Sequence, residues 1–209
     1  MTDRQVRAEE RRTAEPPPTS FSEEYFDRRY ARDPDPWGLA RRWYERRKYA
    51  ITLASLPRER YRACFEPGCS IGELTRLLAP RCDRLLAVDF AEDAVRQARA
   101  AVRDFDHVEV RRSTLPAQLP NGPFDLVVVS EILYYLSRDD LDLMLDGLVD
   151  RLEAGGDLVA VHWCGNGPPR RYNGHDVHPV IEAREELERL VHHSDEQFVL
   201  DVFRRKGTA

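Results

Sequence analysis

Long uninterrupted apolar stretches are absent from this sequence, and none approaches the length that spans a bilayer. The first residues, Met1-Thr2-Asp3-Arg4, lead into polar sequence and lack the apolar segment of a secretory signal. These absences predict a cytoplasmic protein without a membrane partner. The length suits one domain with a substantial core and is short for two domains of ordinary size.

Cysteines are few and stand singly. The four cysteines, Cys64, Cys69, Cys82 and Cys164, form no CxxC pair, and no histidine lies at metal-ligand spacing. We interpret them as reduced thiols in a reducing compartment, and we expect no zinc site.

A strong excess of one charge sign is also missing. The net charge is only −5, although Asp, Glu, Lys and Arg make up 33% of the chain. This balance gives no electrostatic footprint for nucleic acid or for an anionic membrane surface. Basic residues gather at Arg41-Arg42 and Arg46-Arg47-Lys48, which we interpret as a solvated helix face, with a phosphate or substrate contact as the alternative.

Three parts follow one another along the chain. Residues 1–19 are charged and then Pro-rich, with almost no large apolar residues, which predicts a disordered tail. Residues 20–56 are predicted to form a helical cap, in which Ser22 is a candidate N-cap residue for a short first helix and a second helix covers 39–56. Residues 57–206 are predicted to form the main domain.

Short apolar strands alternate with helices from Tyr61 onward. Such alternation is typical of βαβ units and predicts an α/β fold, a three-layer sandwich around a mostly parallel seven-stranded sheet. The last two strands are close enough to form an antiparallel hairpin. The predicted strands cover 62–66, 84–89, 108–110, 124–129, 157–163, 190–193 and 198–203, and the predicted helices cover 73–79, 92–102, 141–152, ended by Gly155-Gly156, and 179–187.

The most informative segment is Glu66-Pro67-Gly68-Cys69-Ser70-Ile71-Gly72, which follows a predicted strand and opens a helix. Its glycines let the backbone turn sharply and let a ligand lie against it without an intervening Cβ. Asp89, at the end of the next strand, can accept hydrogen bonds from both hydroxyls of a ribose. An ordinary strand-to-helix turn is the alternative for the two glycines taken alone.

Two kinds of adenosine ligand compete for this loop. A pyrophosphate cofactor needs the spacing G-x-G-x-x-G, and here Gly68 and Gly72 are separated by three residues. Glu66 and Glu73 beside the loop would repel a phosphate but tolerate a cation. S-adenosylmethionine (SAM) carries a sulfonium and an ammonium and no pyrophosphate. The sign of the charge therefore favours SAM, with S-adenosylhomocysteine (SAH) as the product.

The loop resembles motif I of the class I SAM-dependent methyltransferases, which have a Rossmann-like fold. The resemblance implies that Glu66, Gly68, Ser70, Gly72 and Asp89 contact SAM. It also places Ser113-Thr114-Leu115 on the adenine side, where the family often has an acid that this chain lacks. The segment that ends at Ser130-Glu131 resembles motif IV, which places Ser130 at the cofactor.

A narrower resemblance, to the nodulation methyltransferase NodS and its relatives, covers about residues 21–206. It implies N-methylation of a free amine on a de-N-acetylated chitooligosaccharide, and so a small-molecule acceptor such as an amino sugar or oligosaccharide. The motifs that carry it are Asp35-Pro36-Trp37, Arg42-Trp43-Tyr44-Glu45-Arg46-Arg47-Lys48, Phe65 to Thr75 and Gly174-His175-Asp176-Val177-His178.

Candidate acceptor residues follow the fourth and fifth strands, at the edge where open α/β sheets bind ligands. Glu131 is the first candidate to orient an acceptor amine or to take its proton, with a helix-capping role as the alternative. Of Tyr134 and Tyr135, we expect one to face the site and the other the core. His162 is a second catalytic candidate, or else a packed histidine, and Trp163 is expected beside the acceptor.

Two further segments are expected to close the site. The stretch 164–178 is predicted to be a long loop that binds the acceptor through His175 and Asp176. No metal is expected there, because two histidines without a third ligand are weak support for one. Tyr30 and Trp37 are expected to cover SAM, since aromatic rings favour a sulfonium, with core packing as the alternative.

These features predict a SAM-dependent methyltransferase. Two other interpretations remain: a nicotinamide-dependent oxidoreductase on the same kind of sheet, and a SAM-binding module without catalytic activity. The sequence does not identify the acceptor or the oligomeric state.

Overall fold

The computed structural model of the chain describes residues 19–165 and 172–207. The predicted disordered tail lies outside the described residues, apart from its last residue. None of the described helices is both long enough and apolar enough to cross a membrane.

A seven-stranded sheet forms the middle layer, in the order β3-β2-β1-β4-β5-β7-β6. The first five strands are parallel to one another, and β7 runs antiparallel to both β5 and β6. The predicted fold class is therefore confirmed, including the antiparallel C-terminal hairpin. The strands are β1 (Cys64–Pro67), β2 (Leu85–Asp89), β3 (Val108–Arg112), β4 (Phe124–Ser130), β5 (Leu152–Trp163), β6 (Leu187–Ser194) and β7 (Phe198–Arg205).

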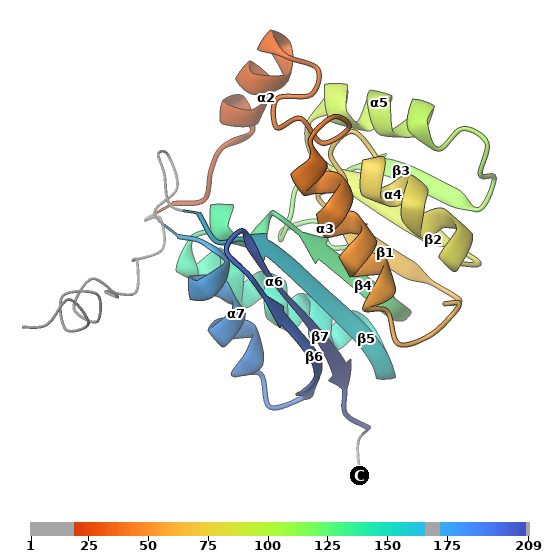
Figure 1. Cartoon of the computed structure of the whole chain (residues 1–209), viewed down its shortest axis with the longest axis vertical. Coiled ribbons are helices and arrows are strands. Elements are labelled where there is room, and N and C mark those ends of the chain that lie inside the picture. The colour runs from red at the N-terminus through yellow and green to blue at the C-terminus, as the bar shows by residue number, and fades with distance from the viewer. Residues whose placement is uncertain (1–18, 166–171, 208–209) are drawn as a thin grey trace, which may run out of the picture.

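Helices cover both faces of the sheet (Figure 1). On one face lie α3 (Trp43–Ala54), α4 (Glu73–Leu78) and α5 (Glu92–Ala101), and on the other lie α6 (Arg138–Arg151) and α7 (Gly174–Glu182). Short 3₁₀ helices, η1 and η2, cover Ala79–Arg81 and Leu133–Tyr135. The predicted second cap helix, α3, thus packs beside α4 in one of the main layers.

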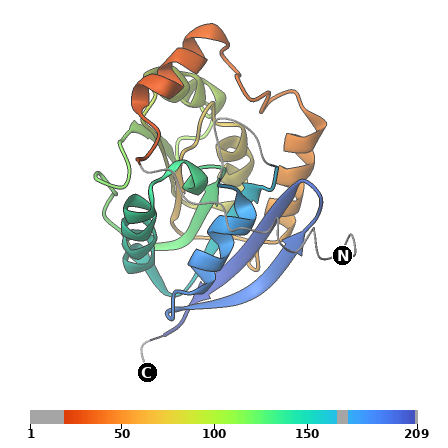
Figure 2. The same cartoon turned by 90° about the vertical axis from the view of Figure 1, so that its left-hand side faces the viewer.

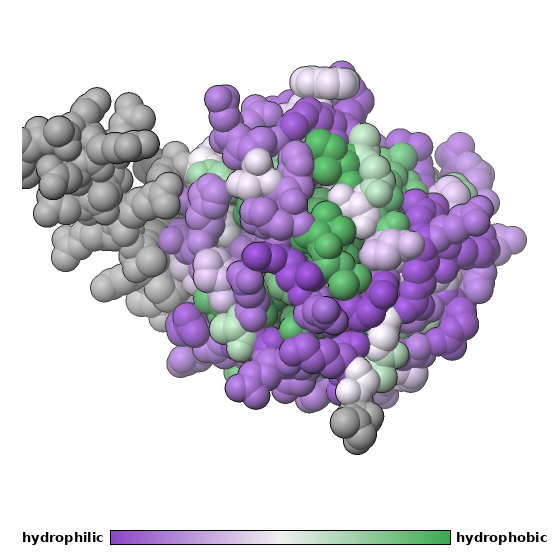
Figure 3. Space-filling view, turned by 60° about the horizontal axis from the view of Figure 1, so that its bottom comes forward, coloured by the Kyte–Doolittle hydropathy of each residue, from purple (hydrophilic) through white to green (hydrophobic). Residues whose placement is uncertain are grey.

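The first helix, α2 (Glu23–Arg32), lies at one end of the molecule near α5, away from the β6–β7 hairpin (Figure 2). Ser22 caps it as predicted, because its side chain accepts a hydrogen bond from Tyr25 N. Hydrophilic residues cover most of the face shown in Figure 3, and hydrophobic residues gather in a smaller area within it.

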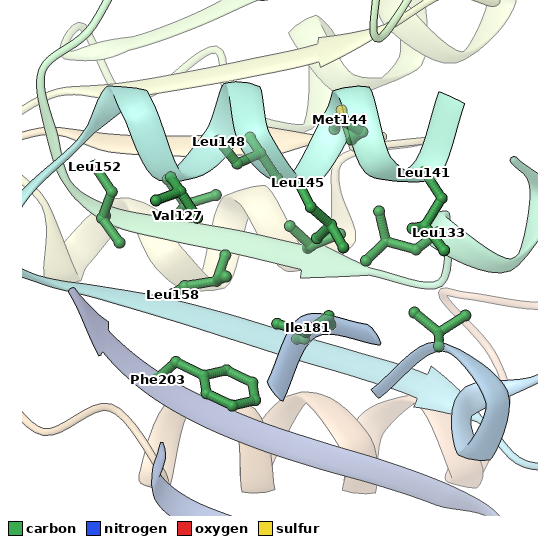
Figure 4. Packing of buried hydrophobic residues seen from close by; sticks show 14 of the residues in the cluster. Val127, Leu133, Leu141, Met144, Leu145, Leu148, Leu152, Leu158, Ile181 and Phe203 are labelled. Carbon is green, nitrogen blue, oxygen red and sulfur yellow. The ribbon is translucent and has the colours of Figure 1, made fainter. Parts of the chain in front are cut away.

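The core is built on β4, whose apolar run is buried on both faces. Alternate residues of a strand point to opposite sides of the sheet. Val127 and Val129 therefore belong to the cluster under α6 and α7, while Leu126 and Val128 belong to the cluster under α3 and α4. Figure 4 shows Leu141, Leu145 and Leu148 of α6 pointing toward β4 and β5.

The start of α7 differs from the prediction of a helix over 179–187. The helix begins at Gly174 because Asn173 and Asp176 form a capping box: Asn173 Oδ1 accepts from His175 N, and Asp176 Oδ2 accepts from Asn173 N. Pro179 lies within the helix rather than at its first turn. The prediction of an unstructured loop over 164–178 is therefore wrong from Gly174 onward, and its residues 166–171 lie outside the described residues.

The fifth strand is also longer than predicted. It begins at Leu152, directly after α6 ends, rather than at residue 157. Gly155 and Gly156 lie within the strand, where Gly155 has φ +76° and the pairing with β4 shifts its register. These glycines mark an irregularity in a strand, as glycine often does, and they do not terminate the preceding helix.

Candidate active site

A cavity of about 780 Å³ lies at the carboxyl ends of β1, β2 and β4, with α2 beside it. Open α/β sheets bind their ligands at this edge. Gly72, His162, His175 and Asp176 are the predicted site residues that do not line it. The predicted residues that do line it are Tyr30, Trp37, Glu66, Gly68, Ser70, Asp89, Ser113, Thr114, Leu115, Ser130, Glu131, Tyr134, Tyr135 and Trp163.

The loop between β1 and α4 turns through positive backbone angles. Gly68 has φ +74°, Ser70 φ 50° and Gly72 φ +83°. Packing also demands the glycines: a Cβ on Gly68 would lie 2.3 Å from the Ile132 side chain, and one on Gly72 would lie 2.8 Å from Ala98 Cα. Gly72 therefore serves the approach of α4 to α5, and its contact with a ligand stays a prediction.

Asp89 ends β2 with its carboxylate held by the backbone. Oδ2 accepts from Ser70 N at 2.9 Å, and Oδ1 accepts from Ala91 N at 3.0 Å. Burial raises the pKa of Asp89 to about 6, although these backbone hydrogen bonds oppose the shift. Each oxygen of a carboxylate has a second lone pair, so both can still accept a hydrogen bond from a ligand.

Glu66 is the second acid at this end of the cavity. It is buried in β1, and its Oε2 atom has no hydrogen-bond partner within the part of the chain that the structure describes. Burial raises the pKa of Glu66 to about 8, Thr75 opposes the shift and Asp89 adds to it. A buried polar atom without a partner is costly, so this geometry favours a ligand that brings a donor or a positive charge.

Residues of α2 and the segment after it close this end of the cavity. The Tyr30 hydroxyl lies 2.5 Å from Ser70 Oγ, and the rings of Tyr30 and Trp37 meet edge to face at 5.4 Å. Thr114 Oγ1 donates to Glu23 Oε1 at 2.7 Å, which ties α2 to the loop after β3. The segment Ser113-Thr114-Leu115 therefore lines the cavity while it holds the helix above it.

Glu131 follows β4 with φ 62° and accepts four hydrogen bonds. Oε1 accepts from Lys48 Nζ at 2.6 Å and Tyr44 Oη at 3.1 Å. Oε2 accepts from Trp163 N at 3.0 Å and, through a short contact, from Tyr134 Oη. Burial alone would raise the pKa of Glu131, but the Lys48 ammonium and these donors lower it to about 2.

Sequence reasoning missed the partners that α3 supplies. Lys48 is fully buried and forms ion pairs with Glu131 and, at 2.8 Å, with Glu45 Oε2. The interpretation of Arg46-Arg47-Lys48 as a solvated face is therefore wrong for Lys48. One signal was available: the chain has only two lysines, Lys48 and Lys206, among 32 basic residues. A lysine at one position of a chain that otherwise uses arginine indicates that the position needs a lysine.

The two tyrosines of η2 both line the cavity, rather than one of the pair alone. Tyr134 is buried and reaches Glu131, while Tyr135 packs edge to face on Phe26 of α2 with ring centroids 5.0 Å apart. The two rings also pack edge to face on each other, with centroids 4.8 Å apart. The two rings thus contact different walls of the same cavity.

His162 lies outside the cavity, in a buried row of polar side chains. Its Nε2 accepts from Leu133 N at 3.3 Å, and its Nδ1 lies 3.0 Å from His178 Nε2. His178 Nδ1 in turn lies 2.5 Å from Asp201 Oδ2. The expectation that His162 faces the acceptor is therefore wrong: the fully buried ring supports η2 from behind.

The predicted acceptor residues of the second loop lie on α7. His175 is exposed in the first turn of the helix, and Asp176 belongs to its capping box. Neither lines the cavity. Across residues 19–165 and 172–207, no three His, Cys, Asp or Glu side chains come together in a way that could hold a metal ion.

The sequence profile of the family described as "Nodulation protein S (NodS)" matches residues 22–163. The chain belongs to the NodS family. Nodulation protein S of Rhizobium tropici is 33% identical to it over 127 residues, which are 60% of this chain and 53% of that protein. Nodulation protein S of Bradyrhizobium diazoefficiens is 34% identical over 52% of each chain. The chain spans about half the length of these curated relatives.

Solved structures agree with this membership. The N-methyltransferase NodS from Bradyrhizobium japonicum, in complex with SAH, matches with a TM-score of 0.77 and 28% identity over 87% of this chain and 97% of that one. A candidate methyltransferase from Pseudomonas syringae matches with a TM-score of 0.70 and 46% identity over 78% of this chain and 100% of that one.

Proposed function

We propose that this protein is a SAM-dependent methyltransferase that methylates an amine nitrogen of a small molecule. The observation that carries the proposal is the charge of the cavity. Among the described residues that line it, Arg42 is the one basic side chain, and an acidic lining favours cationic ligands. The six acidic side chains in the lining are Glu23, Glu45, Glu66, Asp89, Glu131 and Asp140.

The residues at the cofactor end fit SAM. Glu66 offers a buried oxygen without a partner to the ammonium of the amino-acid part. Asp89 retains acceptor capacity for the two ribose hydroxyls. Tyr30 and Trp37 present rings that suit the sulfonium. A dinucleotide would bring a pyrophosphate to the same two acids, and the Asp89 carboxylate would repel it.

The acceptor end combines acids with aromatic side chains: Tyr44, Tyr134 and Trp163 meet around Glu131. SAM supplies an electrophilic methyl group, and an amine forms the new N–C bond as the electron pair of the C–S bond stays on sulfur. An attacking nitrogen gains positive charge, which acids and ring faces stabilise. The NodS resemblance extends this proposal to the free amine of a de-N-acetylated chitooligosaccharide.

Residues 57–206 form the main domain in this proposal, and residues 20–56 complete it. Within 20–56, α2 covers the cofactor end, and α3 supplies Tyr44, Glu45 and Lys48 to the acceptor end. A chain that begins at residue 57 would therefore lose both walls of the cavity.

Binding and turnover together test the proposal. We expect SAH to bind in a calorimeter and to raise the melting temperature, whereas NAD⁺ does neither. Mass spectrometry should then detect a gain of one methyl group on glucosamine or de-N-acetylated chitotetraose, but not on phenol. Binding of NAD⁺ in place of SAH would favour the oxidoreductase interpretation. SAH binding without methyl transfer to any amine of a broad panel would favour a non-catalytic module.

A further inference from the structure

Glu131 is the first catalytic candidate from the sequence, but its carboxylate has no lone pair left for an acceptor amine. An ionised carboxylate offers about four lone-pair sites. Three side-chain donors and one backbone amide occupy two sites on each oxygen, with Lys48 and Tyr44 on Oε1 and Tyr134 and Trp163 N on Oε2. Glu131 is therefore an organiser of the wall and a poor place for a substrate proton.

Glu45 belongs to the same cluster as Lys48 and Glu131, but fewer donors contact its carboxylate. It is 5% exposed and lines the cavity. Its Oε2 lies 2.8 Å from Lys48 Nζ in an ion pair, and hydrogen bonds from Lys48 and Tyr49 act against the rise that burial gives to its pKa. Lys48 is thus shared between two carboxylates. Glu131 accepts from four donors, whereas Lys48 and Tyr49 are the donors to Glu45, so Glu45 keeps lone pairs that Glu131 has lost.

The charge balance of the cluster points the same way. Glu45, Glu131 and Lys48 together carry one net negative charge when all three are ionised. Burial and the Glu131 carboxylate raise the pKa of Glu45 above its usual value, although Lys48 opposes the shift. Glu131 stays ionised at neutral pH. The remaining groups that face Glu45 are the hydroxyls of Tyr44 and Tyr49 on the same helix, whose pKa values burial raises, so both stay protonated.

We propose that Glu45 binds the acceptor ammonium and takes its proton, and that Glu131 is a positioning residue that fixes Lys48, Tyr44 and Tyr134 around it. This inference rests on the proposed amine methylation. The geometry that supports it is the position of Glu45 on the cavity wall with fewer donors than lone pairs, beside a neighbouring acid whose oxygens are all engaged.

The proton that leaves the acceptor amine passes first to Glu45 and then to the solvent. The acceptor enters as R–NH₃⁺, and one proton passes from its nitrogen to a Glu45 oxygen, which leaves R–NH₂ with a free lone pair and Glu45 neutral. Methyl transfer then gives R–NH₂⁺–CH₃. When the product leaves, Glu45 releases its proton to the solvent and is again a carboxylate. A general base placed in this way contributes about 100-fold or more to the rate.

The test compares Glu45→Gln with Glu131→Gln, and uses Glu59→Gln as the control because Glu59 is an exposed acid outside the cavity. SAH binding should be unchanged in Glu45→Gln by calorimetry. Glucosamine binding to the SAH complex should weaken at least tenfold, and kcat should fall about 100-fold or more. The acid limb of the pH–rate profile should move to higher pH in Glu45→Gln, where it follows the ionisation of the acceptor amine itself, and should keep its position, at a lower rate, in Glu131→Gln.

The inference about Glu45 is overturned if Glu45→Gln keeps the wild-type glucosamine affinity and the wild-type position of the acid limb, or if Glu131→Gln alone shifts that limb. If wild-type protein binds no SAH or methylates no amine, it is the proposed function that fails. Should Glu45→Gln not fold, Glu45→Asp carries the test, because its carboxylate is drawn back by one methylene. The acid limb should persist with kcat at least tenfold lower, and an unchanged rate overturns the inference.

Discussion

The two ends of the cavity both contain a pair of buried acids, but they manage the negative charge in opposite ways. At the cofactor end, no basic side chain contacts Glu66 or Asp89 among the described residues, and burial raises their pKa values to about 8 and about 6. At the acceptor end, the chain supplies its own cation, Lys48, and the pKa of Glu131 falls to about 2. Residue type alone therefore does not decide the charge of a carboxyl group. Burial, the nearest cation and the hydrogen-bond donors decide it together, since the pKa of Glu45 stays raised beside the same Lys48.

The two ends of the cavity therefore differ in whether their charges are balanced before a ligand binds. The acceptor end is organised before anything binds, because the Lys48 ion pairs and the donors on Glu131 are internal to the protein. The cofactor end reaches its full charge only when a positive ligand arrives, since desolvation disfavours the ionised form until then. Four predictions test this contrast.

Removal of the internal cation should have the largest effect. Lys48→Met leaves Glu131 and Glu45 buried without a positive partner, and breaking a buried ion pair in this way costs about 3–5 kcal/mol of the free energy of unfolding. Urea denaturation measures this loss. The control is Lys206→Met, because Lys206 is exposed at the end of the chain. A loss below about 1 kcal/mol would mean that Lys48 is not the group that holds the two acids.

Loss of Asp89 should affect binding more than folding. In Asp89→Ala we expect the SAH affinity to fall about 100-fold, because hydrogen bonds to a charged group contribute about 1.5–3 kcal/mol. Titration calorimetry measures the affinity, and Asp93→Ala is the control on the exposed surface of α5. An unchanged affinity in a folded Asp89→Ala protein would remove the ribose assignment.

Glu66 should release a proton when SAH binds. At pH 7 the free protein holds that proton, since burial raises the pKa of Glu66 to about 8, and pairing with the ligand ammonium favours the carboxylate. About one proton should appear in the solvent, and the affinity should rise with pH between about 6 and 8. Calorimetry in two buffers of different ionisation enthalpy measures the release.

Glu66→Gln should abolish both the proton release and the rise of affinity with pH. The unliganded wild-type protein should also lose stability as the pH rises from about 4.5 toward 8, because the unfolded chain gives up this proton at lower pH than the folded chain. Proton release that survives in Glu66→Gln would assign the effect to Asp89.

The cofactor end could be predicted from the sequence because its determinants are local. One short segment, Glu66 to Gly72, carries the turn, the acid and the helix start, and Asp89 follows at the end of the next strand. The strand–helix alternation gave the sheet for the same reason, since strand and helix periodicities are visible within a few residues. The packing role of Gly72 could be found only from the structure, because Gly72 contacts Ala98 of α5, which is distant in the sequence.

The acceptor end could not be predicted in the same way. Lys48 and Glu131 are 83 positions apart, and the pattern of charges in α3 does not distinguish the buried Lys48 from the exposed Arg46 or the half-buried Arg47. His162 shows the converse problem. Its position at the end of β5 is correct for a catalytic residue, yet its side chain points into a row with His178 and Asp201. Strand position fixes the edge of the sheet, and packing decides which side chains reach the cavity.

The smallest expected effect concerns the tie between α2 and the cofactor end, which depends on exposed groups. Glu23→Ala removes the acceptor of the Thr114 hydroxyl and the ion pair with Arg112 at 3.5 Å. Exposed pairs of this kind contribute less than about 1 kcal/mol, so the SAH affinity should fall less than about fivefold. Calorimetry with Glu24→Ala as the neighbouring control measures the change. A loss beyond about tenfold would contradict this view and show that Glu23, which also lines the cavity, acts on the cofactor itself as a third acid at that end.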